Sequence, residues 1–145
     1  MVFLLGGTFR RVIDDLHREL AAQGHGEARP IHGFALQAIS PEGVSISELG
    51  RRLGVSKQAA AKTAKSLESG GYVTRHVGID DARAILLQRT DRAEEVLALS
   101  ARFFDARMRE WRSALGQERF DTMIDALAII GEGRNLGDFP GWLGQ

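Results

Sequence analysis

The chain has only three lysines, Lys57, Lys62 and Lys65, and they stand within nine positions of one another. Gln58, Ala61, Lys62 and Lys65 follow one another at the spacing of a single helix face. Long donor side chains beside small alanines suit a helix that enters a DNA groove about 12 Å wide and reaches phosphates and base edges. An ordinary solvated helix face can have the same composition, so both interpretations are open at this point.

The charge distribution favours an anionic partner. The chain has no net charge, but residues 51–89 hold eight basic and three acidic side chains, which gives that stretch a net charge of +5. The rest of the chain holds 11 basic and 16 acidic side chains and is therefore negative by the same amount. A local positive patch on a neutral molecule indicates binding to an anion such as nucleic acid, although a solvated face explains the charge alone equally well.

The sequence shows no set of residues typical of catalysis or of metal binding. It has no cysteine, and its histidines, His17, His25, His32 and His76, contain no H-x-x-x-H pair, whereas a zinc site needs three or four converging ligands. No Ser/His/Asp set, P-loop or G-x-G-x-x-G is present either. We therefore expect no enzymatic activity, no metal and no cofactor, and polar or partly buried histidines.

No membrane span or secretory signal is expected. The chain contains no run of about 18 apolar residues. Its first residues, MVFLLGGTFRR, place their two arginines after the apolar stretch rather than before it, which is the wrong order for a signal peptide. A cytoplasmic protein is the expectation.

Helix signals surround the lysines. The stretch from Ser45 has the S-x-x-E form of a capping box, and Gly54 offers the left-handed residue that ends a helix. Ser56 is placed to cap a second helix, which should stop near Ser69 at the glycines 70–71. Two helices joined by a short glycine-containing turn form a helix-turn-helix, whose second helix would carry the lysines.

A β-hairpin is predicted directly after this motif. Residues 72–77 and 84–89 have strand composition, and residues 78–83 have turn chemistry. A helix-turn-helix followed by a hairpin is a winged helix. Arginine at the hairpin tip suits a narrow minor groove, and basic residues on the first strand would lie near the DNA backbone. The candidate DNA-binding residues of the hairpin are Arg75, His76 and Arg83.

The remaining sequence predicts a mainly α fold around this small β-hairpin wing. Apolar residues recur at helical spacing between Leu5 and Leu20, with Thr8 in the N-cap region and Gly24 as the stop. The terminal helices carry more apolar surface than one small lobe can cover, so a second subunit is expected to cover it. Further helices are expected at 31–39, 91–115 and 117–130.

The order of these elements resembles the MarR family of transcription regulators. The most specific pieces are SISELGRRLGVSKQAAAKTAKSLESGGYVTR and the wing DDARAILLQRT, in which Asp81 and Arg83 match the family's Asp-x-Arg and Thr90 also matches. The sequence departs from the family pattern at Arg89, where leucine is favoured, and at Ala93, where glycine is favoured. It also has Thr63 and Ala64 where larger aliphatic side chains are common.

The resemblance implies one domain over residues 1–145, with a winged helix-turn-helix lobe at 30–90. It implies dimerisation helices at 1–24 and 91–131, followed by a glycine-rich tail at 132–145. The implied function is a ligand-responsive repressor that binds a pseudo-palindromic operator as a homodimer. A winged-helix protein–protein interaction module without DNA binding is the alternative.

The resemblance also groups the candidate site residues. DNA contacts are expected from Ser56, Lys57, Gln58, Ala61, Lys62, Lys65, Arg75, His76 and Arg83. Effectors of this family often bind between the dimerisation helices and the DNA-binding lobe, and on this chain that analogy brings together Leu16, His17, Leu20, His32 and Phe34. The identity of such an effector does not follow from the sequence.

Overall fold

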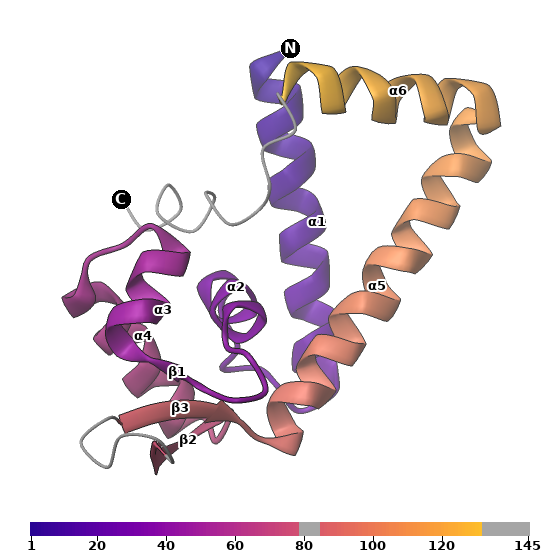
Figure 1. Cartoon of the computed structure of the whole chain (residues 1–145). Helices are drawn as coiled ribbons and strands as arrows, with labels where there is room; N and C mark the ends of the chain where they lie inside the picture. Colours follow the sequence, from indigo (N-terminus) through magenta and orange to yellow (C-terminus); the bar gives the residue numbers. More distant parts are fainter. Residues whose placement is uncertain (79–84, 132–145) are drawn as a thin grey trace.

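The computed structural model describes residues 1–78 and 85–131. Two helices, α1 and α5, lie close together at one end and diverge toward the other, where α6 runs back from α5 toward the start of α1 (Figure 1). The lobe of α2, α3, α4 and the sheet lies at the end where α1 and α5 meet (Figure 1). The elements are α1 (Val2–Ala22), α2 (Pro30–Ala38), β1 (Val44–Ser45), α3 (Ile46–Leu53), α4 (Lys57–Ser69), β2 (Val73–Val77), β3 (Ile85–Arg89), α5 (Asp91–Leu115) and α6 (Gln117–Ile130).

The predicted mainly α fold with a β-hairpin is confirmed. Strands β2 and β3 pair antiparallel, with Val73 opposite Arg89 and Val77 opposite Ile85. A third strand, β1, was not predicted and pairs with β3, so that the sheet order is β1-β3-β2. This extra pairing fixes the start of α3 to the wing, because β1 runs directly into α3.

The main hydrophobic core lies in the lobe that holds the helix-turn-helix. It includes fully buried leucines on α2, α3, α4 and β3, and the C-terminal part of α1 docks on it through Leu16 and Leu20. The lobe and the end of α1 therefore form one packed body. Its largest fully buried side chains include Tyr72, Leu36, Ile39, Leu49, Leu53, Leu67 and Leu87.

The predicted start of the first helix differs from the structure. Helix α1 begins at Val2, and Thr8 lies inside it rather than in its N-cap region. Gly6 and Gly7 lie inside this helix, and a Cβ added at either position would meet no atom within 4 Å. The predicted stop is confirmed, because α1 ends at Ala22 and Gly24 follows with a φ of +89°.

The capping box at Ser45 forms only in part. The Ser45 hydroxyl accepts a hydrogen bond from the Glu48 N–H at 3.2 Å, as predicted. The Glu48 carboxylate does not complete the box, because it pairs with Arg51 and Arg52 of the same helix. Charge-assisted bonds to two guanidinium groups are stronger than one bond to a backbone N–H.

Candidate nucleic-acid interface

The turn between α3 and α4 is tight because small residues line it. Gly54 ends α3 in the left-handed conformation, with a φ of 65°. The Ser56 hydroxyl then accepts from the Ala59 N–H at 3.1 Å and caps α4. A Cβ on Gly50 would lie 3.1 Å from the Val55 carbonyl oxygen, so glycine allows the two helices to approach closely. These features set the angle between α3 and α4.

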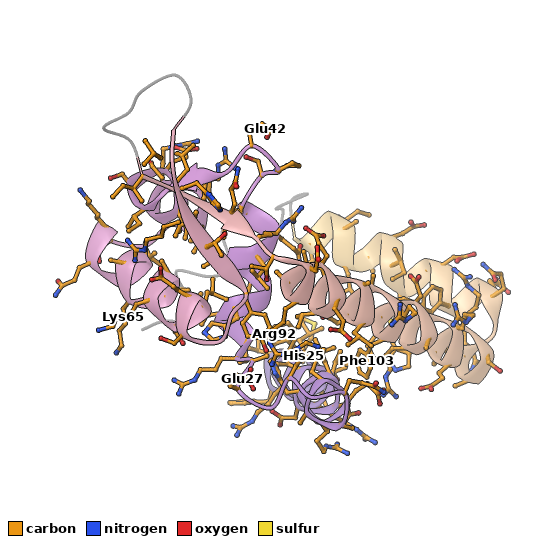
Figure 2. All side chains as sticks on the ribbon, turned by 90° about the horizontal axis from the view of Figure 1, so that it is seen from below. His25, Glu27, Glu42, Lys65, Arg92 and Phe103 are labelled. Atoms are coloured by element: carbon orange, nitrogen blue, oxygen red, sulfur yellow. The ribbon has the colours of Figure 1, made fainter. Side chains whose placement is uncertain are left out.

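Helix α4 has a packed face and an open face. Ala60, Ala64 and Leu67 are fully buried against the lobe. Thr63 and Ala61 are only partly buried. The open face carries the exposed side chains of Lys57, Gln58, Lys62 and Lys65, and Lys65 points away from the body (Figure 2).

Ion pairs change the charge of the basic stretch. Four of its arginines have acidic partners, and two of those partners, Glu48 and Glu94, lie outside residues 51–89. Among the described residues of the stretch, the cations without an ion-pair partner are the three lysines of α4. The positive patch is therefore smaller than the whole of residues 51–89, and it centres on α4. The pairs are Arg51 and Arg52 with Glu48, Arg75 with Glu68, and Arg89 with Glu94.

The wing residues have local partners. The Nε of Arg75 donates to both carboxylate oxygens of Glu68 at 3.1 Å, and both side chains are partly exposed. His76 is exposed, and its Nε2 lies 2.8 Å from the Thr74 hydroxyl. Arg83, the predicted minor-groove residue, lies outside the described residues.

The structure brings together four of the five residues predicted to bind an effector. Leu16, His17 and Leu20 of α1 and Phe34 of α2 line one cavity of about 560 Å³. His32 does not line it. This residue is buried on the other side of α2, where its ring centroid lies 6.5 Å from that of Tyr72.

The cavity extends between α1, α2, α5 and α6, and its lining is mostly apolar. Among the described residues, no aspartate or glutamate lines it, and Arg29 is the one lining arginine or lysine. Burial lowers the pKa of His17 below its usual value, so the imidazole tends to be neutral. The polar lining residues are Thr8, His17, Arg29, Gln37 and Ser100.

A polar cluster around the buried side chains of His25 and Tyr72 was not predicted. His25 and Glu27, from the loop after α1, meet Tyr72 and Arg92 (Figure 2 labels the histidine, the glutamate and the arginine). Arg92 Nη2 lies 2.6 Å from Glu27 Oε1, and this pairing lowers the pKa of Glu27 to about 2. The members are far apart in the sequence, so no local pattern indicates them.

No group of three or more histidine, aspartate or glutamate side chains within residues 1–78 and 85–131 could hold a metal ion. In the same part of the chain, no helix is both long enough and apolar enough to cross a membrane.

Comparison with known proteins identifies relatives of this arrangement. The sequence model of the MarR family matches residues 30–84, which include α3, α4 and the first strand of the wing. The transcriptional repressor MprA of Escherichia coli is 29% identical over 87 residues, which are 60% of this chain and 49% of MprA. The chain thus spans about half the length of this relative.

Solved structures share the fold over nearly the whole chain. FabT of Streptococcus pneumoniae in complex with DNA superimposes with a TM-score of 0.73 at 20% identity, covering 89% of this chain and 91% of FabT. CouR of Rhodococcus jostii, bound to p-coumaroyl-CoA, gives a TM-score of 0.62 at 21% identity, covering 88% and 89%. Residues 30–84 of the chain are therefore similar to the MarR family, and the capped helix-turn-helix, the paired wing strands and the long flanking helices are arranged as in these solved structures.

Proposed function

We propose that this protein is a sequence-specific DNA-binding transcription regulator, in which α4 enters the major groove. The observation that carries the proposal is the open face of α4, where Gln58 and the three lysines without ion-pair partners among the described residues project from a helix with a rigid, capped start. The fold shared with DNA-bound FabT supports this role. From this proposed role it follows that the protein regulates transcription in the cytoplasm and does not catalyse a reaction.

The proposal divides the single domain of residues 1–145 into parts. The lobe at 30–90 would bind DNA, and the helices at 1–24 and 91–131 would join two subunits. The tail at 132–145 lies outside the described residues and has no assigned role. Contacts to DNA are proposed for Ser56, Lys57, Gln58, Ala61, Lys62, Lys65, Arg75, His76 and Arg83.

A second copy of the chain is the proposed cover of the apolar helix ends. Phe3 is 95% exposed at the start of α1, and Ile129 is 78% exposed near the end of α6. These two ends lie next to each other (Figure 1). Contiguous exposed apolar surface of this kind marks an interface. A twofold dimer covers the same patch on both subunits and presents two copies of α4 to a pseudo-palindromic site.

The cavity between the helices is the proposed effector site. Within the part of the chain that the structure describes, its lining is apolar with one arginine and no carboxylate, which suits an apolar molecule that carries an anionic group. CouR with p-coumaroyl-CoA shows that a protein of this fold holds such a ligand. An effector bound there would contact both α1 and the lobe, and repression relieved by the effector is the proposed mode of regulation.

Selection of bound sequences from random duplex DNA tests the function directly. We expect the full chain to enrich one motif with half-sites about one helical turn apart. Binding profiles over all single-base changes then separate the roles of residues on α4. Gln58→Ala should relax the choice at one or two positions in each half-site, whereas Lys65→Ala should weaken binding evenly. Arg119→Ala, an exposed change on α6, is the control and should alter neither property.

The response to salt separates the proposal from its alternative. A dimer that neutralises about six phosphates should give a slope of about −5 in a plot of log affinity against log salt concentration. No enriched motif and a flat salt response would instead indicate a winged-helix module that binds protein.

A further inference from the structure

A polar cluster around the buried side chains of His25 and Tyr72 joins three parts of the molecule that are separate in the sequence, and its two carboxylates are exposed to solvent. We call it the His25 clamp, and it consists of His25, Glu27, Tyr72, Arg92 and Glu95. His25 and Glu27 belong to the loop between α1 and α2, Tyr72 follows α4, and Arg92 and Glu95 lie in the first turns of α5. The clamp thus connects the exit of the DNA-facing helix to both of the long helices that flank the lobe.

The geometry of the clamp places His25 between two groups. Its side chain is 1% exposed, and its Nδ1 lies 3.2 Å from the Tyr72 hydroxyl. That hydroxyl in turn lies 3.2 Å from Glu27 Oε1 and donates to it. On the other side of the ring, Nε2 is buried without a hydrogen-bond partner among the described residues and lies 3.5 Å from Glu95 Oε2.

Counting protons shows what the clamp lacks. Three contacts between electronegative atoms need a proton each: His25 to Tyr72, Tyr72 to Glu27, and His25 to Glu95. A neutral imidazole and a tyrosine hydroxyl supply only two protons, because neutral histidine has one N–H. One contact is therefore always without a proton, whichever tautomer forms. An imidazolium has two N–H groups, and with it all three contacts have a donor.

The surrounding charges favour the same state. Glu27 and Glu95 contribute two negative charges, and Arg92 contributes one positive charge, so a neutral His25 leaves the clamp with a net negative charge. Protonation of His25 makes the clamp neutral overall. The titratable groups that face it are Glu27 of its own loop, Tyr72 after α4, Arg92 and Glu95 of α5, and beyond Tyr72 the buried His32 of α2.

Main-chain hydrogen bonds connect the clamp to α4 and to the wing. The Tyr72 N–H donates to the Leu67 carbonyl in the last turns of α4, and the Thr90 N–H donates to the Tyr72 carbonyl. Arg92 Nε donates to the Gly70 carbonyl at the end of the same helix. A force on the Tyr72 ring is therefore transmitted to the end of α4 and to the start of α5.

We propose that His25 is a proton-operated switch: its protonation closes the clamp and fixes α4 relative to α1 and α5. The effect on DNA affinity rests on the function proposed above, whereas the closure itself does not. Lowering the pH from about 8 to about 5.5 spans the range in which histidine ordinarily titrates. When the clamp gains its third proton, operator affinity rises because α4 is held in one position.

Glu95→Gln tests the closure, because an amide can supply the missing proton. The amide introduced at this position can donate to a neutral Nε2 or accept from a protonated one, so the clamp is complete at either pH. We expect this variant to melt about 2–4 °C above the wild type at pH 8. At pH 5.5 the two proteins should melt at the same temperature, or the wild type higher.

Comparing the two proteins cancels the pH effects that they share. Burial lowers the pKa of His17 and of His32, and both residues are present in each protein. Glu118→Gln, an exposed change of the same charge on α6, is the control and should differ from the wild type by a constant amount. A difference between wild type and Glu95→Gln that is also constant between pH 8 and pH 5.5 would overturn the proposal.

The DNA arm of the test uses the duplex that the wild type selects. At constant ionic strength we measure the ratio of operator affinity at pH 5.5 to that at pH 8 for each protein. We expect this ratio to be about fivefold larger for the wild type than for Glu95→Gln, which is within the usual range of coupling between sites. Equal pH dependence in the two proteins, with the melting difference present, would refute the switch and leave the clamp purely structural. If no DNA is selected at all, the proposed function fails, and the melting comparison still decides whether the clamp closes.

Discussion

Glu68 and Arg75 form the ion pair next to the open face of α4. The glutamate neutralises a wing arginine that would otherwise add to the positive surface, since Arg75 Nε is bonded to both of its carboxylate oxygens. Glu68→Gln should therefore increase affinity for the selected operator about two- to fivefold and steepen the salt slope by about one per subunit. Titrations at several salt concentrations measure both quantities.

The control for this change is Glu118→Gln on α6, which removes the same charge far from the lobe and should leave the salt slope unchanged. Lower affinity in Glu68→Gln would mean that the carboxylate positions Arg75 for DNA instead of competing with it.

Residue types predicted the lysine face but not its electrostatic surroundings. The spacing of Lys57, Lys62 and Lys65 predicts that they are exposed on one helix. In the structure all three are exposed on α4. The net charge of the stretch did not describe the surface, because Glu48 and Glu94 come from outside the stretch and pair with its arginines. A count along the sequence does not include partners that folding brings in. The DNA contacts themselves stay a prediction.

At the scale of elements, the turn between α3 and α4 depends on one backbone conformation. Gly54 has a φ of 65°, and no atom within 4 Å would touch an added Cβ. Gly54→Ala should therefore destabilise the protein only through the left-handed backbone, by about 1–2 kcal/mol. Urea unfolding at neutral pH measures the difference.

Gly26→Ala is the matched control for that substitution. Its Cβ would meet Ala21 at an ordinary 3.9 Å, and its φ is not in the left-handed region. We expect it to change stability by less than about 0.5 kcal/mol. If both variants lose the same free energy of unfolding, the loss in Gly54→Ala does not come from the left-handed backbone of the turn.

The link between the α1–α2 loop and α5 should weaken in acid. Arg92 lowers the pKa of Glu27 to about 2, below the ordinary value of 4.5. The unfolded chain therefore takes up a proton first as the pH falls. The contribution of the pair to stability is complete above about pH 4.5 and is lost as the pH falls through about 2.

Glu27→Gln isolates this contribution. The variant should have a lower urea midpoint than the wild type at pH 7, and the gap should shrink at about pH 2.5, where the wild type is losing the charge as well. Glu118→Gln serves as the comparison at both pH values. A gap that stays constant in acid would show that Glu27 acts only through its packing.

Capped and periodic elements were predictable, and unmarked ones were not. The bounds of α4, α5 and α6 agree with the sequence because serine, threonine and glycine mark their ends. Strand β1 has two residues and no turn that ties it to β3, so its pairing has no local signal. The early start of α1 was missed because Thr8 has the residue type of an N-cap, whereas the helix begins six residues earlier, at Val2.

For the whole molecule, the main expectation is a dimer formed through the ends of α1 and α6. Phe3→Asp combined with Ile129→Asp places charge on one strongly exposed apolar side chain of each helix end. We expect wild type to sediment at twice the mass of one chain at about 10 μM, whereas the variant should sediment as a single chain. Val77→Asp, at an exposed apolar position of the wing, should remain dimeric.

Contacts between distant segments decide the parts of the site that the sequence could not predict. His25 and Tyr72 are 47 residues apart, and Arg92 and Glu27 are 65 apart. The analogy predicted that His32 would lie at the effector site together with the residues of the cavity. In the structure its side chain is on the opposite face of α2 and lies near Tyr72. The placement of Leu16, His17, Leu20 and Phe34 around one cavity agrees with the analogy, and their role in binding an effector stays a prediction.

The division of α4 into a packed and an open face has a consequence for how such proteins diverge. Ala60, Ala64 and Leu67 carry the attachment of the helix to the lobe, whereas Gln58 and Lys62 face outward and carry none of it. Substitutions at the outward positions can therefore accumulate after gene duplication without a loss of stability. One scaffold can in this way acquire new target sequences by single changes, while its three small or apolar anchoring residues stay as they are.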